Sequence, residues 1–235
     1  MRGSIPCLSL LFACAALAGC ASSHGAVTTP AAHVEEHAAA VGPDEALKIL
    51  LDGNRRFVAG SQHARSGEVA LRSKLATSQS PYAIIVSCSD SRVTPELVFD
   101  QTLGEIFVVR TAGHVLADPG LGSVEYAVEH LHSPLIVVLG HERCGAVSAA
   151  VAGGEAPGHI AALVQAIQPA VQASKGEPGD AVDNAVRAHV RDVVHQLENT
   201  APILAEFVHA KHLKIVGAYY DLDTGEVQLL PTEKK

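Results

Sequence analysis

Four short apolar runs are the feature that most restricts how this chain can fold. Each is rich in β-branched or aliphatic residues and carries few charges, as in strands that are buried on both faces. The runs are residues 82–88, 105–110, 134–140 and 214–221. Helix-like stretches separate them, so the pattern predicts an α/β fold with a central, mostly parallel sheet covered by helices.

The segments between the apolar runs have the hydrophobic spacing of helices. Helices are expected over residues 43–60, 121–131, 143–151, 159–173, 180–197 and 201–211. Asp44 is expected to cap the first helix, and residues 224–230 to return as a hairpin, giving four strands plus an antiparallel edge strand. Because 48% of the 235 residues are hydrophobic, one substantial core is possible. We predict one folded domain from 44 to 235.

The first 43 residues have a different character. Residues 1–19 combine one Arg, a short apolar run and small residues, which is typical of a secretory signal peptide. The sequence Leu-Ala-Gly-Cys at 17–20 resembles a bacterial lipobox, so we expect cleavage before Cys20 and a lipid on its thiol. Residues 20–43 are predicted to form a flexible tether. The resulting expectation is an exported lipoprotein, periplasmic or at the cell surface; the alternative is an ordinary signal peptide without a role for Cys20.

The charge balance restricts the partners. The formal net charge is −8, and nucleic acids and anionic membranes both attract clustered Lys and Arg. We therefore predict no nucleic-acid partner, and membrane attachment only through the lipid on Cys20.

Cysteines are few in the predicted domain. Cys7 and Cys14 would leave with the signal peptide and Cys20 would carry lipid, which leaves Cys88 and Cys144. Two cysteines in an oxidising compartment commonly form a disulfide. A non-enzymatic or redox lipoprotein with a Cys88–Cys144 bridge is therefore one hypothesis.

Reactive side chains follow two of the apolar runs. Cys88, Asp90 and Arg92 come at the end of the first run, and His141 and Cys144 at the end of the third. If the strand continued past Cys88, the side chains of Cys88, Asp90 and Arg92 would point to the same face of the sheet. A surface ion pair is the alternative for Asp90 and Arg92.

The carboxyl ends of parallel strands meet at one edge of a sheet, where ligands commonly bind. Cys88, His141 and Cys144 would then lie close together. Two thiolates and one imidazole are a ligand set suited to Zn²⁺, and three protein ligands leave one position open, as in catalytic zinc sites. We predict one zinc ion per chain.

The motifs "CSDSRV" and "GHERCGAV" together resemble the paired signature of the β-class carbonic anhydrases. The resemblance extends over nearly all of residues 44–230. It implies that Cys88, His141 and Cys144 bind zinc and that Asp90 and Arg92 form a dyad beside it.

Within the family, the chain resembles the branch whose metal site is always open to water. This resemblance implies that Gln79, Phe107 and Tyr126 line a pocket for CO₂, with Gln79 and Tyr126 contributed by a partner subunit. A homodimer or a dimer of dimers is therefore expected. The alternatives are a loop residue without a substrate role for Gln79, a core residue for Phe107 and packing on its helix for Tyr126. His114 stands where the family pattern predicts Asn, so hydrogen bonding behind the site is expected to differ.

The predicted function is reversible, zinc-dependent hydration of CO₂ to bicarbonate and a proton, by attack of zinc-bound hydroxide on CO₂. Asp90 would orient the hydroxide, and Arg92 would hold Asp90, which could otherwise become a fourth zinc ligand in a closed form. Because two thiolates donate more charge than imidazoles, we expect activity to rise with pH. A carbonyl sulfide or carbon disulfide hydrolase on the same scaffold is the alternative.

The remaining histidines of the domain lie on predicted helices and loops. Most are expected to be exposed or locally hydrogen-bonded, and one could carry protons to buffer. They include His130, His132, His159, His189, His195, His209 and His212.

Overall fold

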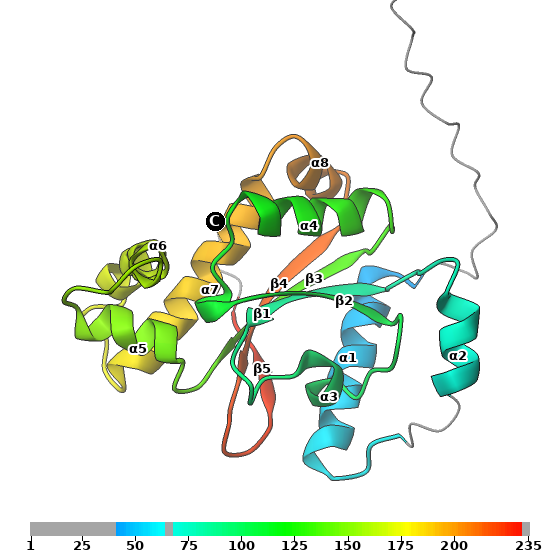
Figure 1. Ribbon diagram of the computed structural model, residues 1–235, viewed down its shortest axis with the longest axis horizontal. Helices are drawn as coiled ribbons and strands as arrows, with labels where there is room; N and C mark the ends of the chain where they lie inside the picture. The colour runs from blue at the N-terminus through cyan, green and yellow to red at the C-terminus, as the bar shows by residue number, and fades with distance from the viewer. Residues whose placement is uncertain (1–40, 64–67, 232–235) are drawn as a thin grey trace, which may run out of the picture. The chain divides into compact units, whose positions relative to one another are not determined.

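A five-stranded sheet organises the part of the chain described by this computed structural model, residues 41–63 and 68–231 (Figure 1). The strands are β1 (Ala83–Cys88), β2 (Ile106–Thr111), β3 (Leu135–His141), β4 (Lys214–Tyr220) and β5 (Val227–Leu229). Their order is β2-β1-β3-β4-β5. The first four are parallel, and β5 pairs antiparallel with β4. The predicted fold class is confirmed.

The two central strands explain the continuous apolar runs. Every residue of β1 and β3 is buried, and successive side chains enter opposite cores. Ile84 and Val86 of β1 pack into one core, whereas Ile85 packs into the other. Both faces of these strands are covered, so a polar residue is tolerated only near their ends.

The described residues contain eight helices, several of which cover the two faces of the sheet. They are α1 (Pro43–Val58), α2 (Glu68–Leu75), α3 (Pro95–Val98), α4 (Asp118–Glu129), α5 (Gly145–Ala152), α6 (Ile160–Ala173), α7 (Ala181–Asn199) and α8 (Ile203–His209), with a short 3₁₀ turn at Ala112–His114. Residues of α4, α7 and α8 form the core on one face, and residues of α1 and α3 pack on the other. A third cluster joins α5, α6 and the start of α7 beside the two cysteines.

Three local expectations differ from the structure. The run at 105–110 was expected to be a buried strand, but β2 is an edge strand and only half-buried. Asp44 does not cap α1, because the helix begins at Pro43 after Gly42; Asp44 instead lies in the first turn and pairs with Lys214 at 2.6 Å. Helices α2 and α3 were not expected.

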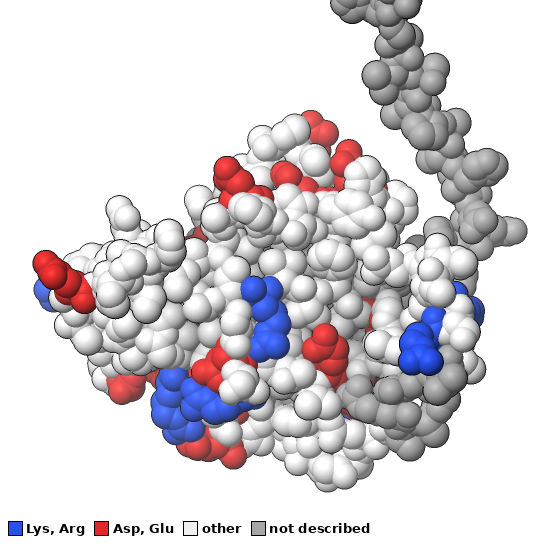
Figure 2. Space-filling model, in the orientation of Figure 1, with Lys and Arg blue, Asp and Glu red and all other residues white. Residues whose placement is uncertain are grey.

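The predicted signal peptide, Cys20 and most of the tether lie outside the described residues. Among the helices of residues 41–63 and 68–231, none combines the length and apolar character needed to cross a membrane. On the face drawn in Figure 2, Lys and Arg side chains lie in small separate groups, several with Asp or Glu beside them.

Candidate metal centre

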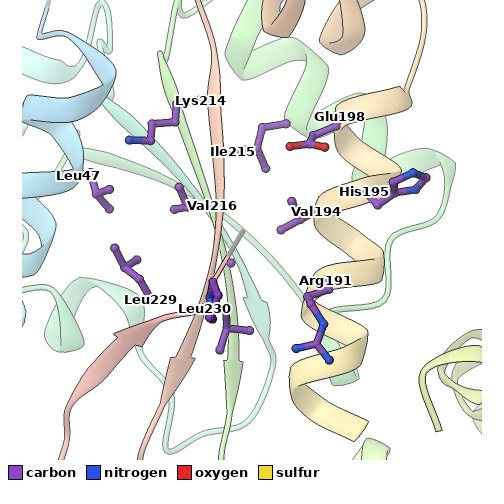
Figure 3. Close-up of a pocket in the computed structure, with 12 residues that line it drawn as sticks. Leu47, Arg191, Val194, His195, Glu198, Lys214, Ile215, Val216, Leu229 and Leu230 are labelled. Carbon is purple, nitrogen blue, oxygen red and sulfur yellow. The ribbon is translucent and has the colours of Figure 1, made fainter. Parts of the chain in front are cut away.

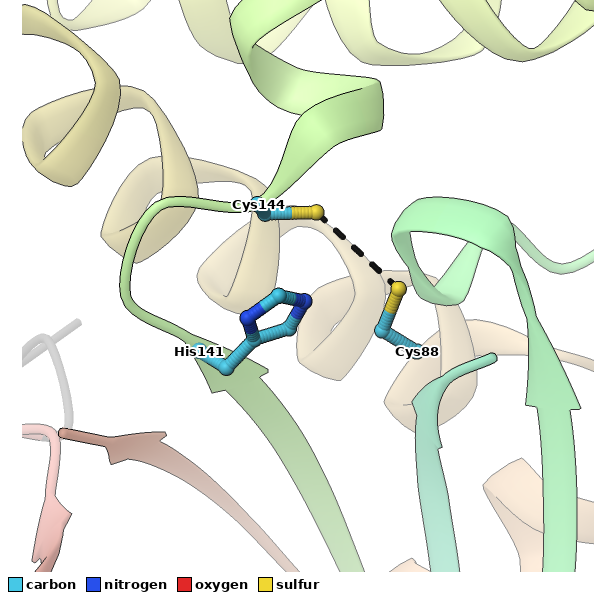
Figure 4. A group of neighbouring side chains, drawn as sticks. All are labelled: Cys88, His141 and Cys144. Atoms are coloured by element: carbon cyan, nitrogen blue, oxygen red, sulfur yellow. Dashed lines mark hydrogen bonds between the residues drawn. The ribbon is translucent and has the colours of Figure 1, made fainter. Parts of the chain in front are cut away.

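Three buried side chains converge at the carboxyl edge of the sheet (Figure 4). Cys88, His141 and Cys144 each offer one ligand atom, and these atoms lie within 4.8 Å of one another. The two sulfurs are 4.0 Å apart and both thiols are free, whereas a disulfide bond is about 2.05 Å long. The structure thus contains a Cys–His–Cys cluster in place of the bridge weighed above.

Strand register brings these residues together across 53 positions of sequence. Cys88 ends β1 and His141 ends β3. The two strands pair from Ile84 opposite Ile136 to Ser87 opposite Leu139, so their last residues emerge side by side. Arg143, with φ of 51°, turns the chain so that Cys144 stands directly before α5.

The imidazole of His141 is oriented for a ligand. Its Nδ1 lies 2.9 Å from the carbonyl oxygen of Glu142. A carbonyl only accepts, so Nδ1 carries the hydrogen and Nε2 keeps a lone pair. Nε2 is buried and has no hydrogen-bond partner, and an unpaired buried acceptor costs about 1–3 kcal/mol. A metal ion would satisfy this atom.

The two thiols ionise unequally. Hydrogen bonding with Cys144 and with the Gly113 amide lowers the pKa of Cys88, against the effect of burial. The pKa of Cys144 is raised, because Cys88 is beside it and because it is buried. One thiolate therefore forms readily and the second is opposed by the first. A divalent cation between the sulfurs would remove this opposition.

Asp90 and Arg92 form a bidentate ion pair next to the cluster. Arg92 Nε donates to Asp90 Oδ1 at 2.9 Å and Nη2 donates to Oδ2 at 2.8 Å. The Arg92 hydrogen bonds keep the pKa of Asp90 below its usual range. Asp90 Oδ2 is 3.9 Å from His141 Nε2, so this pair lies at the cluster and is not a remote surface pair.

The sequence pattern predicted this pair from strand alternation, and that prediction is wrong. Strand β1 ends at Cys88. The backbone amide of Arg92 donates to Asp90 Oδ1 at 3.0 Å, which is an Asx turn. The tight turn, and not a continued strand, places the carboxylate and the guanidinium side by side.

Arg110, which the sequence analysis did not single out, supports this turn. Its Nε donates to the carbonyl oxygen of Cys88 at 3.0 Å. Its Nη2 donates to the carbonyls of Asp90 and Val93 at 2.8 and 2.7 Å. An Arg near the end of an apolar strand was the available signal, since it sits at the same sheet edge as Cys88.

The predicted substrate residues lie on three other segments: Gln79 between α2 and β1, Phe107 in β2 and Tyr126 in α4. Gln79 is exposed and lines a depression of about 530 Å³ together with Arg72 and Leu103. Phe107 of β2 is half-buried against a core. Tyr126 of α4 is 48% exposed, with its ring 5.1 Å from that of His130. Two of these three side chains thus face solvent in the single chain.

A separate, mostly apolar hollow of about 400 Å³ lies along β4 (Figure 3). Leu47 of α1, Val194 of α7 and Leu229 of β5 line parts of it. None of the predicted site residues lines this hollow.

Comparisons with protein families and with curated proteins both find carbonic anhydrases. A family model described as carbonic anhydrase matches residues 83–227. Carbonic anhydrase 2 of Mycobacterium tuberculosis is 44% identical over 191 residues, which cover 80% of this chain and 92% of that protein.

Solved structures show the same likeness. A Coccomyxa β-carbonic anhydrase in complex with acetazolamide has a TM-score of 0.62 at 27% identity, and the match covers 78% of this chain and 86% of that chain. A tetrameric β-carbonic anhydrase from Sordaria macrospora has a TM-score of 0.64 over 79% of this chain and 97% of that one. At 23% identity, the second similarity concerns the fold alone.

Proposed function

The chain belongs to the β-class of the carbonic anhydrase family, and on that premise we propose that it catalyses the reversible hydration of CO₂ to bicarbonate and a proton. One observation carries the proposal: a buried Cys88–His141–Cys144 cluster lies beside a carboxylate held by an arginine. This arrangement supports the proposal, because the three side chains could hold a metal ion while Asp90, clamped by Arg92, accepts a hydrogen bond beside it.

We propose Zn²⁺ as the cofactor, one ion per chain. Two sulfurs and one imidazole nitrogen form a soft donor set that suits zinc, and the orphaned Nε2 of His141 fits a ligand to it. Bound zinc would supply a Lewis acid that brings the pKa of a water molecule from about 15.7 to the neutral range. The three residues leave a fourth position for that water.

Asp90 and Arg92 have separate tasks. Asp90 would accept a hydrogen bond from the nucleophile and orient it toward the carbon of CO₂. Arg92 engages both oxygens of Asp90, which would keep the carboxylate from taking the open ligand position. The planar fork of Arg suits this bidentate clamp.

The substrate pocket would be completed by a second copy of the chain. Gln79 would donate its amide to a substrate oxygen, Phe107 would supply apolar wall and Tyr126 would close the pocket. The exposure of Gln79 and Tyr126 in the single chain supports this arrangement. We propose a homodimer or a dimer of dimers.

No observation favours hydrolysis of carbonyl sulfide or carbon disulfide. The matched relatives are carbonic anhydrases by description, and the pair of free thiols removes the basis of the disulfide-bridged redox protein.

We also propose that the protein is exported and anchored by a lipid on Cys20, on the strength of the sequence at 17–20. Mass spectrometry of the membrane fraction, comparing the native chain with Cys20→Ala, tests this. A native N-terminus without diacylglycerol at Cys20 would contradict it.

Stopped-flow CO₂ hydration on the purified protein tests the proposed activity, with metal analysis on the same sample. We expect one zinc per chain and rapid hydration, with both lost in Cys88→Ser. Sulfide release from carbonyl sulfide is the companion assay. Fast release without CO₂ hydration would overturn the proposal.

A further inference from the structure

Two buried histidines lie behind the metal centre and take no part in the proposed reaction. His114, in the 3₁₀ turn, is 1% exposed, and His189, on α7, is 4% exposed. Their ring centroids are 4.6 Å apart. Most histidines of this domain are expected to be exposed or locally hydrogen-bonded, and His189 is neither. Buried imidazoles are desolvated at a cost, so their contacts are informative.

His189 is connected to a zinc ligand through one residue. Its Nε2 lies 3.1 Å from the carbonyl oxygen of Gly113. The amide nitrogen of the same Gly113 donates to Cys88 Sγ at 3.2 Å. Since the carbonyl is only an acceptor, Nε2 must carry the ring hydrogen. The other ring nitrogen, Nδ1, is buried without a partner, which agrees with this tautomer.

Gly113 has a backbone conformation that needs support. Its φ is 65°, in the left-handed region, and a Cβ there would lie 2.9 Å from Ile167 Cδ1 and 3.0 Å from Ala146 Cβ. Glycine fits this space but has high conformational freedom. A hydrogen bond from the long helix α7 to the Gly113 carbonyl would hold the residue in place.

We propose that His189 is a positioning residue of the metal centre: it anchors Gly113 so that the Gly113 amide stays directed at the sulfur of Cys88. The inference rests on the proposed function. A hydrogen bond to a thiolate withdraws charge from the sulfur and fixes its direction, and such outer contacts tune metal sites.

His114 supports His189 by contact. The two rings are tilted by 34° at close range, and neither ring nitrogen of His114 has a partner. The shorter side chain of Asn, which the family pattern predicts at this position, would reach less far toward His189. Burial lowers the pKa of His189 to about 4, so the ring is neutral at ordinary pH and retains a single hydrogen.

Cobalt substitution tests the proposal with a readout that does not involve turnover. His189→Met keeps bulk without a donor, and His189→Gln keeps an N–H at a similar reach. Val193→Ala opens a cavity on the same helix, in a core cluster to which Cys88 does not belong. In His189→Met we expect the sulfur-to-cobalt charge-transfer band to move to longer wavelength and zinc affinity to fall about tenfold in chelator competition. His189→Gln should restore both.

Val193→Ala should lower the melting temperature and leave the band unchanged. If His189→Met leaves band and affinity unchanged, or if His189→Gln fails in the same way as His189→Met, the proposal is overturned. Should His189→Met not fold, nitrogen-15 NMR of the histidines in the native protein decides. Hydrogen on Nε2 of His189 supports the proposal, and hydrogen on Nδ1 overturns it.

Failure of the proposed function is distinguishable from failure of this inference. If His189→Met shifts the cobalt band as expected while the native zinc protein does not hydrate CO₂, only the proposed activity is contradicted.

Discussion

The two sides of the proposed active site differ in how completely one chain builds them. On the metal side, the ligands are buried, and Arg110 and the Gly113 amide fix the segment that carries Cys88. On the substrate side, Gln79 and Tyr126 are exposed and Phe107 lies on a half-buried edge strand. The difference supports the proposal that the metal site is built within one subunit and that the CO₂ pocket is completed by a second subunit.

The largest effect should come from the metal side. Cys144→Ala removes a sulfur ligand, so we expect loss of zinc and a fall in CO₂ hydration of more than about 100-fold, beyond the range typical of outer contacts. Metal analysis and stopped-flow kinetics measure this. Circular dichroism checks that the overall helix content is retained. Full zinc content with native turnover would show that the cluster is not the metal site.

Arg92→Ala should lower turnover by about 100-fold while zinc is retained. Without the guanidinium, the Asp90 carboxylate is free to approach the metal position. Arg55→Ala is the matched control, because Arg55 pairs with Asp52 on the exposed side of α1 and such pairs contribute little. Unchanged turnover in Arg92→Ala would exclude a gating role.

Arg110→Lys should have an intermediate effect. Lysine keeps the charge but cannot donate to the three carbonyls of Cys88, Asp90 and Val93 with the geometry of the Arg fork. We expect an approximately tenfold loss in zinc affinity, measured by chelator competition, with Arg55→Lys as the control. Equal affinities would mean that the turn holds its own shape.

Tyr126→Arg addresses the substrate side. If α4 contacts a partner there, a buried positive charge should dissociate the oligomer and reduce turnover several-fold without loss of zinc. Light scattering after size exclusion measures the mass, and Glu155→Arg, in an exposed loop, is the control. An unchanged mass and rate would place the pocket within one chain.

The smallest effect concerns pH. The Arg92 hydrogen bonds lower the pKa of Asp90. Stabilisation by the pair is therefore fully present above the ordinary Asp pKa of about 4 and is lost progressively as pH falls from there through the lower folded value. The difference in free energy of unfolding between the native protein and Asp90→Asn should be equal at pH 8 and pH 5, and smaller below pH 3. Urea titrations test this, and a difference that already vanishes at pH 5 would contradict it.

Much of the fold followed from the sequence because β1 and β3 are buried on both faces and read as unbroken apolar runs. The Cys–His–Cys convergence followed for the same reason, since parallel strands end at one edge. The sequence of the half-buried edge strand β2 resembles that of a central strand, because composition does not reveal whether a strand pairs on one side or on both.

Other parts of the site depend on contacts that sequence patterns do not contain. The Asp90–Arg92 pair arises from an Asx turn, whereas the sequence pattern predicted it from strand alternation. The role of Arg110 depends on three backbone carbonyls. The burial of His189 depends on how α7 packs on the turn around Gly113.

The pairing of β1 with β3 has a consequence for assembly. The two strands are hydrogen-bonded to each other up to the residues before Cys88 and His141. The sheet therefore sets the distance between these two proposed metal ligands, even without a bound ion. Small zinc-binding domains such as zinc fingers differ, because they fold only when the metal is bound. This protein should therefore survive demetallation as a folded apoprotein and accept a replacement ion without refolding.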